Sequence, residues 1–250
     1  MSSSGVVLYQ YPRAGRLESV SPFCVKVHLA LKYKRLPYEV VDVHNRFLLG
    51  RITPRGRLPA ADVGGERVVD SSDIVAALER LAPDPPLYPA ESLLRARAQV
   101  YEDWADEVLY PYVLYWRWLI EPPHPTRAFA FLPIFLRPAA IAYYRHTVQQ
   151  RLRYQGTGTK PESVVRNEIA AELAALSALL AGAGGPFLLG TAEPTIADIA
   201  VFAQIDGLYW KPLPQAMALL ERHESIMTWY RAVDERTRGR EGLNSPRDTP

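Results

Sequence analysis

Cysteine is almost absent from this sequence: Cys24 is the only one among 250 residues, which excludes an internal disulfide and a zinc site built from cysteines. Neither sign of charge dominates, because 29 lysines and arginines face 27 aspartates and glutamates without any run of five like charges. Nucleic acid is therefore not expected as a partner. The five histidines lack metal-ligand spacing, so we assign no metal. Because no secretory signal opens the sequence, we expect a cytoplasmic protein that binds a small molecule or another protein.

Long hydrophobic runs are also missing. The most apolar stretch, residues 128–144, is interrupted by Arg137 and two prolines, and it is shorter than the ~20 apolar residues that span a bilayer. We therefore expect no membrane span and interpret the stretch as a buried helix or an interaction surface. Proline, in contrast, is abundant, and four of the 22 prolines fall within residues 82–89. This density predicts a stiff linker at 83–90 that separates two domains.

The two sides of this linker differ in their patterns. Before it, short β-rich runs alternate with helical spacing, which predicts two strands, a hairpin and two helices at residues 5–9, 38–43, 58–69, 23–31 and 71–81. After it, strand signals fade, and helices are predicted over 93–119 and 163–181, with a mobile tail from about 236. The sequence thus predicts an α/β domain at 1–82, with Ser71 or Ser72 capping its last helix, and an all-α domain at 91–250.

The first helix begins with Ser21-Pro22-Phe23-Cys24. Serine is a preferred N-cap and proline is favoured at the first helical position, so this stretch could serve only to start the helix. The same helix start presents unpaired N–H groups and the positive end of the helix dipole, which stabilise a thiolate or another anion. Position alone leaves both interpretations open.

A second group of residues favours a ligand site. Proline at a strand start is tolerated only at an edge or in a special turn, and a cis Leu58-Pro59 bond would leave the flanking backbone available to a peptide-like ligand. Asp70 and Ser71, at the next helix start, offer a carboxylate to an ammonium group and a hydroxyl with helix N–H groups to a carboxylate. A ligand with both charges at one end would fit there.

In this order, these motifs resemble the glutathione S-transferase superfamily over almost the whole chain. Residues 195–198 (Thr-Ile-Ala-Asp) are similar to the capping box of a buried helix in that family. The long loop 11–20 and the motif Tyr-Gln-Gly-Thr-Gly at 154–158 are similar to its metaxin and failed-axon-connections-like branch. The resemblance implies a thioredoxin-like domain followed by a helical domain, assembled as a homodimer.

The resemblance also implies roles for individual residues. Glutathione would be the cosubstrate, conjugated to a small hydrophobic electrophile, with Ser21 as the activating hydroxyl. The remaining contacts would come from Leu58 and Pro59 at the cysteinyl part, Asp70 and Ser71 at the γ-glutamyl end, Arg55 and Arg57 at the glycyl carboxylate, and Tyr112 and Tyr115 in the electrophile pocket. We weigh two alternatives: a non-catalytic binding or scaffold protein, and a thiol reductase that acts through Cys24.

Overall fold

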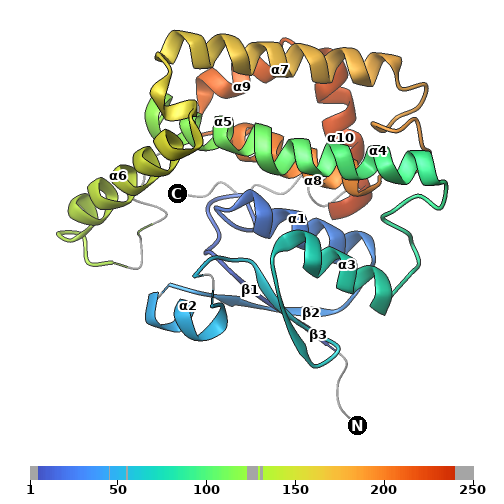
Figure 1. Cartoon of the computed structure of the whole chain (residues 1–250), viewed down its shortest axis with the longest axis horizontal. Helices are drawn as coiled ribbons and strands as arrows, with labels where there is room; N and C mark the ends of the chain where they lie inside the picture. The colour runs from blue at the N-terminus through green and yellow to red at the C-terminus, as the bar shows by residue number, and fades with distance from the viewer. Residues whose placement is uncertain (1–4, 45, 55, 123–128, 130–131, 240–250) are drawn as a thin grey trace.

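The computed structural model describes residues 5–44, 46–54, 56–122, 129 and 132–239, and its sheet lies beneath a layer of helices (Figure 1). The strands are β1 (Val6–Gln10), β2 (Tyr38–Asp42), β3 (Ala60–Val63) and β4 (Glu66–Val69), in the spatial order β2-β1-β3-β4. β1 pairs in parallel with β2 and antiparallel with β3. This mixed sheet confirms the α/β fold predicted for the first half of the chain.

Three helices accompany the sheet. α1 (Pro22–Tyr33) connects the parallel strands β1 and β2, and ten of its twelve residues are buried because it also packs against helices of the second half. α3 (Ser71–Leu81) follows β4, but its N-cap is Asp70, not Ser71 or Ser72 as expected: the Ser72 N–H donates to Asp70 Oδ1 at 3.1 Å. α2 (Arg46–Ile52) lies between β2 and β3, in a stretch where the sequence predicted neither a helix nor a strand.

The second half is helical, as predicted, and it begins with one long rod. α4 (Ser92–Asp103) and α5 (Tyr110–Tyr115) are joined and extended by two π-helical segments, η1 (Trp104–Leu109) and η2 (Trp116–Ile120). The helices that follow are α6 (Arg137–Gln155), η3 (Thr157–Thr159), α7 (Glu162–Gly182), α8 (Ile196–Leu208), α9 (Pro214–Leu220) and α10 (Glu224–Arg238). All thirteen residues of α8 are buried. α8 therefore forms the centre of the core and packs on α1.

The start of α8 carries the predicted capping box. The Asp198 carboxylate accepts from the Thr195 N–H at 2.9 Å, and it also accepts from the Leu188 N–H and the Trp229 indole N–H, both at 2.9 Å. The linker docks close by, because the Ile196 N–H donates to the Leu87 carbonyl at 2.9 Å. The box and the linker thus fix α8 against the first half of the chain.

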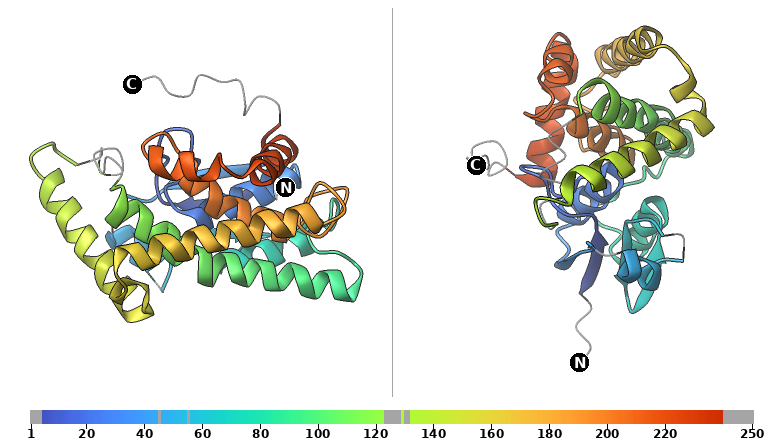
Figure 2. Two further views of the ribbon diagram at one scale, coloured as in Figure 1. Left: turned by 90° about the horizontal axis from the view of Figure 1, so that it is seen from above. Right: turned by 90° about the vertical axis from the view of Figure 1, so that its left-hand side faces the viewer.

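Two expectations about apolar and terminal segments need correction. The stretch 128–144 was interpreted as a buried helix or an interaction surface. In its described part Ile134 and Phe135 are 77% and 76% exposed, which fits a surface and contradicts a buried helix. In the described ranges, no helix is long and apolar enough to cross a bilayer. Residues 236–238 are the last turn of α10 rather than a mobile tail, and 240–250 lie outside the described residues. α6 extends sideways from the other helices (Figure 2).

The end of α10 is tied to the loop that precedes α1. Arg238, only 7% exposed, pairs with Glu18 and with Asp206, each at 2.7 Å, while Arg16 pairs with Asp206 at 2.6 Å and Lys32 with Glu18 at 2.6 Å. Burial would raise the pKa of Glu18, but Arg238 and Lys32 lower it well below its usual range. This buried network holds loop 11–20, and with it the start of α1, in place.

Candidate active site

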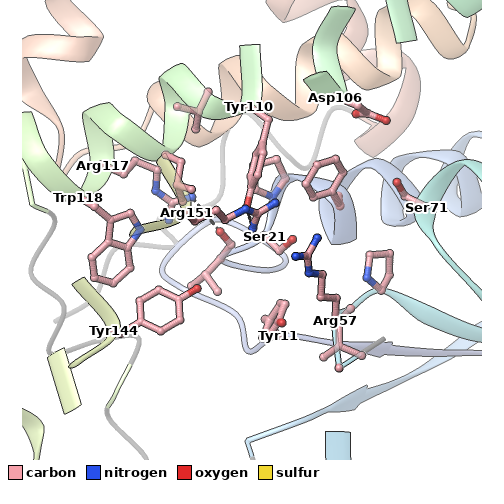
Figure 3. A pocket seen from close by; sticks show the side chains of 18 of the residues that line it. Tyr11, Ser21, Arg57, Ser71, Asp106, Tyr110, Arg117, Trp118, Tyr144 and Arg151 are labelled. Carbon is pink, nitrogen blue, oxygen red and sulfur yellow. Dashed lines mark hydrogen bonds between the residues drawn. The ribbon is translucent and has the colours of Figure 1, made fainter. Parts of the chain in front are cut away.

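A cavity of about 810 Å³ lies between the two halves of the chain. Its floor consists of the α1 start, the turn before β3 and the α3 start, its roof is the α4–η2 rod, and α6 lies at one side (Figure 3). The volume is typical of a site for a small ligand. Of the site residues predicted in the first half, the six that the structure describes all line it: Ser21, Arg57, Leu58, Pro59, Asp70 and Ser71.

Ser21 is the N-cap residue of α1, but its side chain does not cap the helix. Its backbone is extended, and its N–H donates to Ser19 Oγ at 3.2 Å. The hydroxyl lies on the cavity wall in the neighbourhood of Tyr11 and Tyr110 (Figure 3). The Ser21 side chain therefore does not cap the helix, which is the usual role of serine at this position.

The Leu58-Pro59 peptide bond is cis, as expected. Leu58 is 5% exposed and packs with Cys24 and Ala60, and Tyr11 from the opposite loop packs on the same cluster. Arg57 is exposed and borders the cavity. Arg55 lies outside the described residues.

Carboxylates gather at the α3 end of the cavity, where Asp70, Asp103, Asp106 and Glu107 are all lining residues. Asp70 has φ +87°, a conformation that non-glycine residues rarely adopt and that is found at ligand sites. Ser71 is buried and also lines the cavity. The geometry suits a ligand group that carries an ammonium beside a carboxylate.

Asp106 was not found from the sequence. Its Oδ2 lies 2.8 Å from the buried Lys26 ammonium, which also pairs with Glu102 at 2.6 Å. Its Oδ1 is buried and accepts no hydrogen bond. Burial raises the pKa of Asp106 to about 6 despite Lys26. The unpartnered oxygen is an acceptor that a cationic group in the cavity would satisfy.

Cys24 does not fit the reductase alternative. The side chain is fully buried behind Ser21, among Val43, Leu58 and Ala60. Burial raises the pKa of its thiol to about 11, although hydrogen bonds from Tyr11 and Ser21 favour the thiolate. A reactive cysteine needs an accessible sulfur and a lowered pKa, and Cys24 has neither.

The aromatic rod contributes to the cavity, but not through the expected tyrosines. Tyr112 donates to Glu168 of α7 at 3.2 Å, and the buried Tyr115 lies on the α7 side as well, so neither lines the cavity. The lining positions recur every three or four residues along one face, as Asp103, Asp106, Glu107, Tyr110, Pro111, Val113, Leu114, Arg117 and Trp118. This periodicity was the available signal, and Tyr112 falls on the opposite face of the helix.

Comparisons with known proteins agree with this geometry. The glutathione S-transferase N-terminal domain profile matches residues 22–123, and the C-terminal domain profile matches residues 145–238. The chain is 38% identical over 73 residues to Failed axon connections of Drosophila melanogaster, a match that covers 29% of this chain and 16% of that protein. The chain spans less than half the length of the curated relatives it matches.

Solved structures share the whole fold. Glutathione transferase GSTFuA3 of Phanerochaete chrysosporium superposes with a TM-score of 0.69 at 22% identity, covering 93% of this chain and 97% of that one. A glutathione S-transferase of Methylobacterium radiotolerans, in complex with glutathione sulfonate, superposes with a TM-score of 0.63 at 23% identity over 95% and 94% of the two chains. With both domain profiles matched in order and the fold shared along its length, the chain belongs to the glutathione S-transferase superfamily.

Proposed function

We propose that the protein binds glutathione in this cavity and conjugates it to a small, largely apolar electrophile. The observation that carries the proposal is the convergence of Ser21, the cis Leu58-Pro59 turn and the acidic α3 end on one cavity. Asp70 and Asp106 would accept the γ-glutamyl ammonium, and Ser71 with the first N–H groups of α3 would bind the adjacent carboxylate. Arg57 would reach the glycyl carboxylate.

In this arrangement Ser21 would activate the cosubstrate thiol. A thiol pKa of about 8.5 leaves only a few per cent thiolate at pH 7, and lowering it by about two units takes about 2.7 kcal/mol. A hydroxyl hydrogen bond to a charged sulfur contributes about 1.5–3 kcal/mol, and the α1 dipole about 0.3–1 kcal/mol. The thiolate then attacks the electrophilic carbon, the C–S bond forms, and the leaving group departs with its bonding electron pair.

Exchange of Ser21 for alanine tests this assignment. Because the Ser21 side chain makes no capping hydrogen bond, Ser21→Ala should leave the melting temperature nearly unchanged while turnover falls about tenfold or more, a factor of ten for each 1.4 kcal/mol of lost thiolate stabilisation. Cys24→Ser is the matched control and should retain turnover.

Calorimetric titration with glutathione separates the enzyme from its alternative. Glutathione binding with no turnover toward any electrophile would establish a non-catalytic binding protein. If glutathione does not bind at all, the proposal is wrong. Turnover that persists in Ser21→Ala would move the activating role to another group, with Tyr11 on the same wall as the first candidate.

The family resemblance further suggests a two-fold dimer. Light scattering of the purified chain would give about twice the monomer mass of 28.1 kDa if this is so. A monomeric mass at micromolar concentration would rule the dimer out without affecting the proposed chemistry, since every group named above comes from one chain.

A further inference from the structure

The end of the cavity away from Asp106 holds a buried cation, Arg117, that forms no ion pair with any residue the structure describes. Arg117 is 7% exposed, and its NH1 donates to the Val20 carbonyl at 2.8 Å. Its Nε is buried and finds no acceptor. Among the residues that the structure describes, no carboxylate pairs with it. A buried guanidinium in this state has lost its hydration without gaining an ionic partner.

The carboxylates nearest to this end are engaged elsewhere. Asp206, which acts on Arg117 through its charge, is bound by Arg16 and Arg238 at 2.6 and 2.7 Å. Glu121 of the same rod accepts from the Trp116 indole N–H at 2.8 Å and from the backbone N–H groups that open α9. Burial accordingly lowers the pKa of the Arg117 guanidinium. Among the described residues, none therefore offers an anion that pairs with Arg117.

A second cation and a set of aromatic rings complete this end. Arg151 of α6 lies over the Tyr110 ring at 5.0 Å and donates to its hydroxyl at 3.2 Å, with no carboxylate partner in the described ranges. Trp118, Tyr144 and Arg117 lie together on one side of Ser21, and Asp106 and Ser71 on the other (Figure 3). The cavity is thus divided into an acidic end and a basic, aromatic end.

From this division we infer that the electrophile carries a carboxylate on an apolar or aromatic body, and that Arg117 binds this carboxylate. The inference rests on the proposed function, since it names the substrate class of the same cavity. The acidic end takes the ammonium of glutathione, while the planar guanidinium supplies the N–H donors that match a carboxylate. Trp118 and Tyr144 would pack against the apolar body.

A pair of electrophiles that share one reacting ring, and of which only one carries a carboxylate, tests the inference. 4-Chloro-3-nitrobenzoate and its methyl ester both react at the ring carbon that bears chlorine: the glutathione sulfur attacks, the C–S bond forms, the C–Cl bond breaks, and chloride leaves with the electron pair. The value of kcat/KM for each is divided by its uncatalysed rate constant with glutathione. Affinity for each compound without glutathione is measured separately, by quenching of tryptophan fluorescence.

The arginine variants have a matched control. Arg166 lies over the Trp116 ring at 5.2 Å, as Arg117 lies over the Trp210 ring at 5.3 Å, but Arg166 belongs to α7 and does not line the cavity. We expect the acid to be favoured over the ester about tenfold or more in both measurements. Arg117→Gln should abolish this preference, while Arg166→Gln retains it. Arg117→Lys should restore part of it, which separates lost charge from lost folding.

Two results would overturn the inference: an ester that binds as tightly as the acid, or an Arg117→Gln variant that weakens both compounds equally while still melting as the wild type does. If glutathione neither binds nor reacts, the proposed function fails. The fluorescence measurement then still decides the anion subsite, because it needs no cosubstrate.

Discussion

Loss of Arg238 should destabilise the whole protein, because its guanidinium joins the last described helix to the loop before α1. Removing one partner from a buried ion pair costs about 3–5 kcal/mol. After Arg238 is removed, Glu18 still pairs with Lys32 and Asp206 still pairs with Arg16, each at 2.6 Å. We therefore expect Arg238→Met to lie at the lower end, a loss of about 3 kcal/mol in the free energy of unfolding. For a chain of this size that corresponds to a melting temperature about 6–12 °C lower.

The same helix supplies the control. Arg236 pairs with Glu193 at 2.6 Å, but both side chains are half exposed, at 51% and 52%, so Arg236→Met should cost less than about 1 kcal/mol. Urea unfolding followed by circular dichroism compares the two variants. A loss below 1 kcal/mol in Arg238→Met, or equal losses in both, would refute the assignment of this network as a stabilising contact.

The acid range offers a second check on the same network. Because Arg238 and Lys32 hold the pKa of Glu18 below its unfolded value, the stability that Glu18 contributes is present above pH ~4.3 and is lost as the pH falls further. Arg238→Met raises that pKa toward its usual value. The gap in stability between wild type and variant should therefore narrow as the pH is lowered below about 4. A gap that stays constant down to pH 3 would contradict this cause.

Two further predictions concern the acidic end of the cavity. Asp70→Asn should weaken glutathione binding about ten- to hundredfold, since a charge-assisted hydrogen bond contributes about 1.5–3 kcal/mol and asparagine remains a good N-cap. Asp73→Asn, on the exposed side of α3, should change calorimetric affinity less than twofold, and equal effects would show that Asp70 only caps the helix. The pKa of Asp106 is raised to about 6, so glutathione affinity should fall as the pH is lowered through 6, where protonation removes the acceptor charge. Titration of Asp106→Asn should give the same affinity at pH 7 and pH 5, and a retained pH dependence would assign it to another group.

The site residues that were predicted correctly from the sequence lie at or just before the start of a helix or strand. Ser21, Leu58 and Asp70 each stand at a helix or strand start, where backbone groups are unpaired and a few residues decide the local conformation. Such signals are local, so they can be interpreted without knowing the fold. The short α2 escaped detection because its seven residues include a glycine and are too few to show a helical period clearly.

The roof of the cavity could not be predicted in the same way. Tyr112 and Tyr115 were predicted as pocket residues because they are aromatic. The rod carries aromatic residues on several faces, however, and only the rotation of the helix decides which of them face the first half of the chain. The two π-helical segments shift that rotation. The character of Asp106 depends on Lys26, which is distant in sequence, and that of Arg117 on the lack of an ion pair with any described residue. Such pairings follow from tertiary packing alone.

The ion pair between Arg238 and Glu18 also determines the order in which parts of the growing polypeptide can complete their contacts. Ribosomes synthesise about 5–20 residues per second, so the 217 residues from Pro22 to Arg238 take roughly 10–40 s to follow Ser21. During that time loop 11–20 lacks Asp206 and Arg238, and α1 lacks the α8 surface on which it packs. The first half of the chain is synthesised first, but its part of the site can be completed only after the end of α10 has left the ribosome.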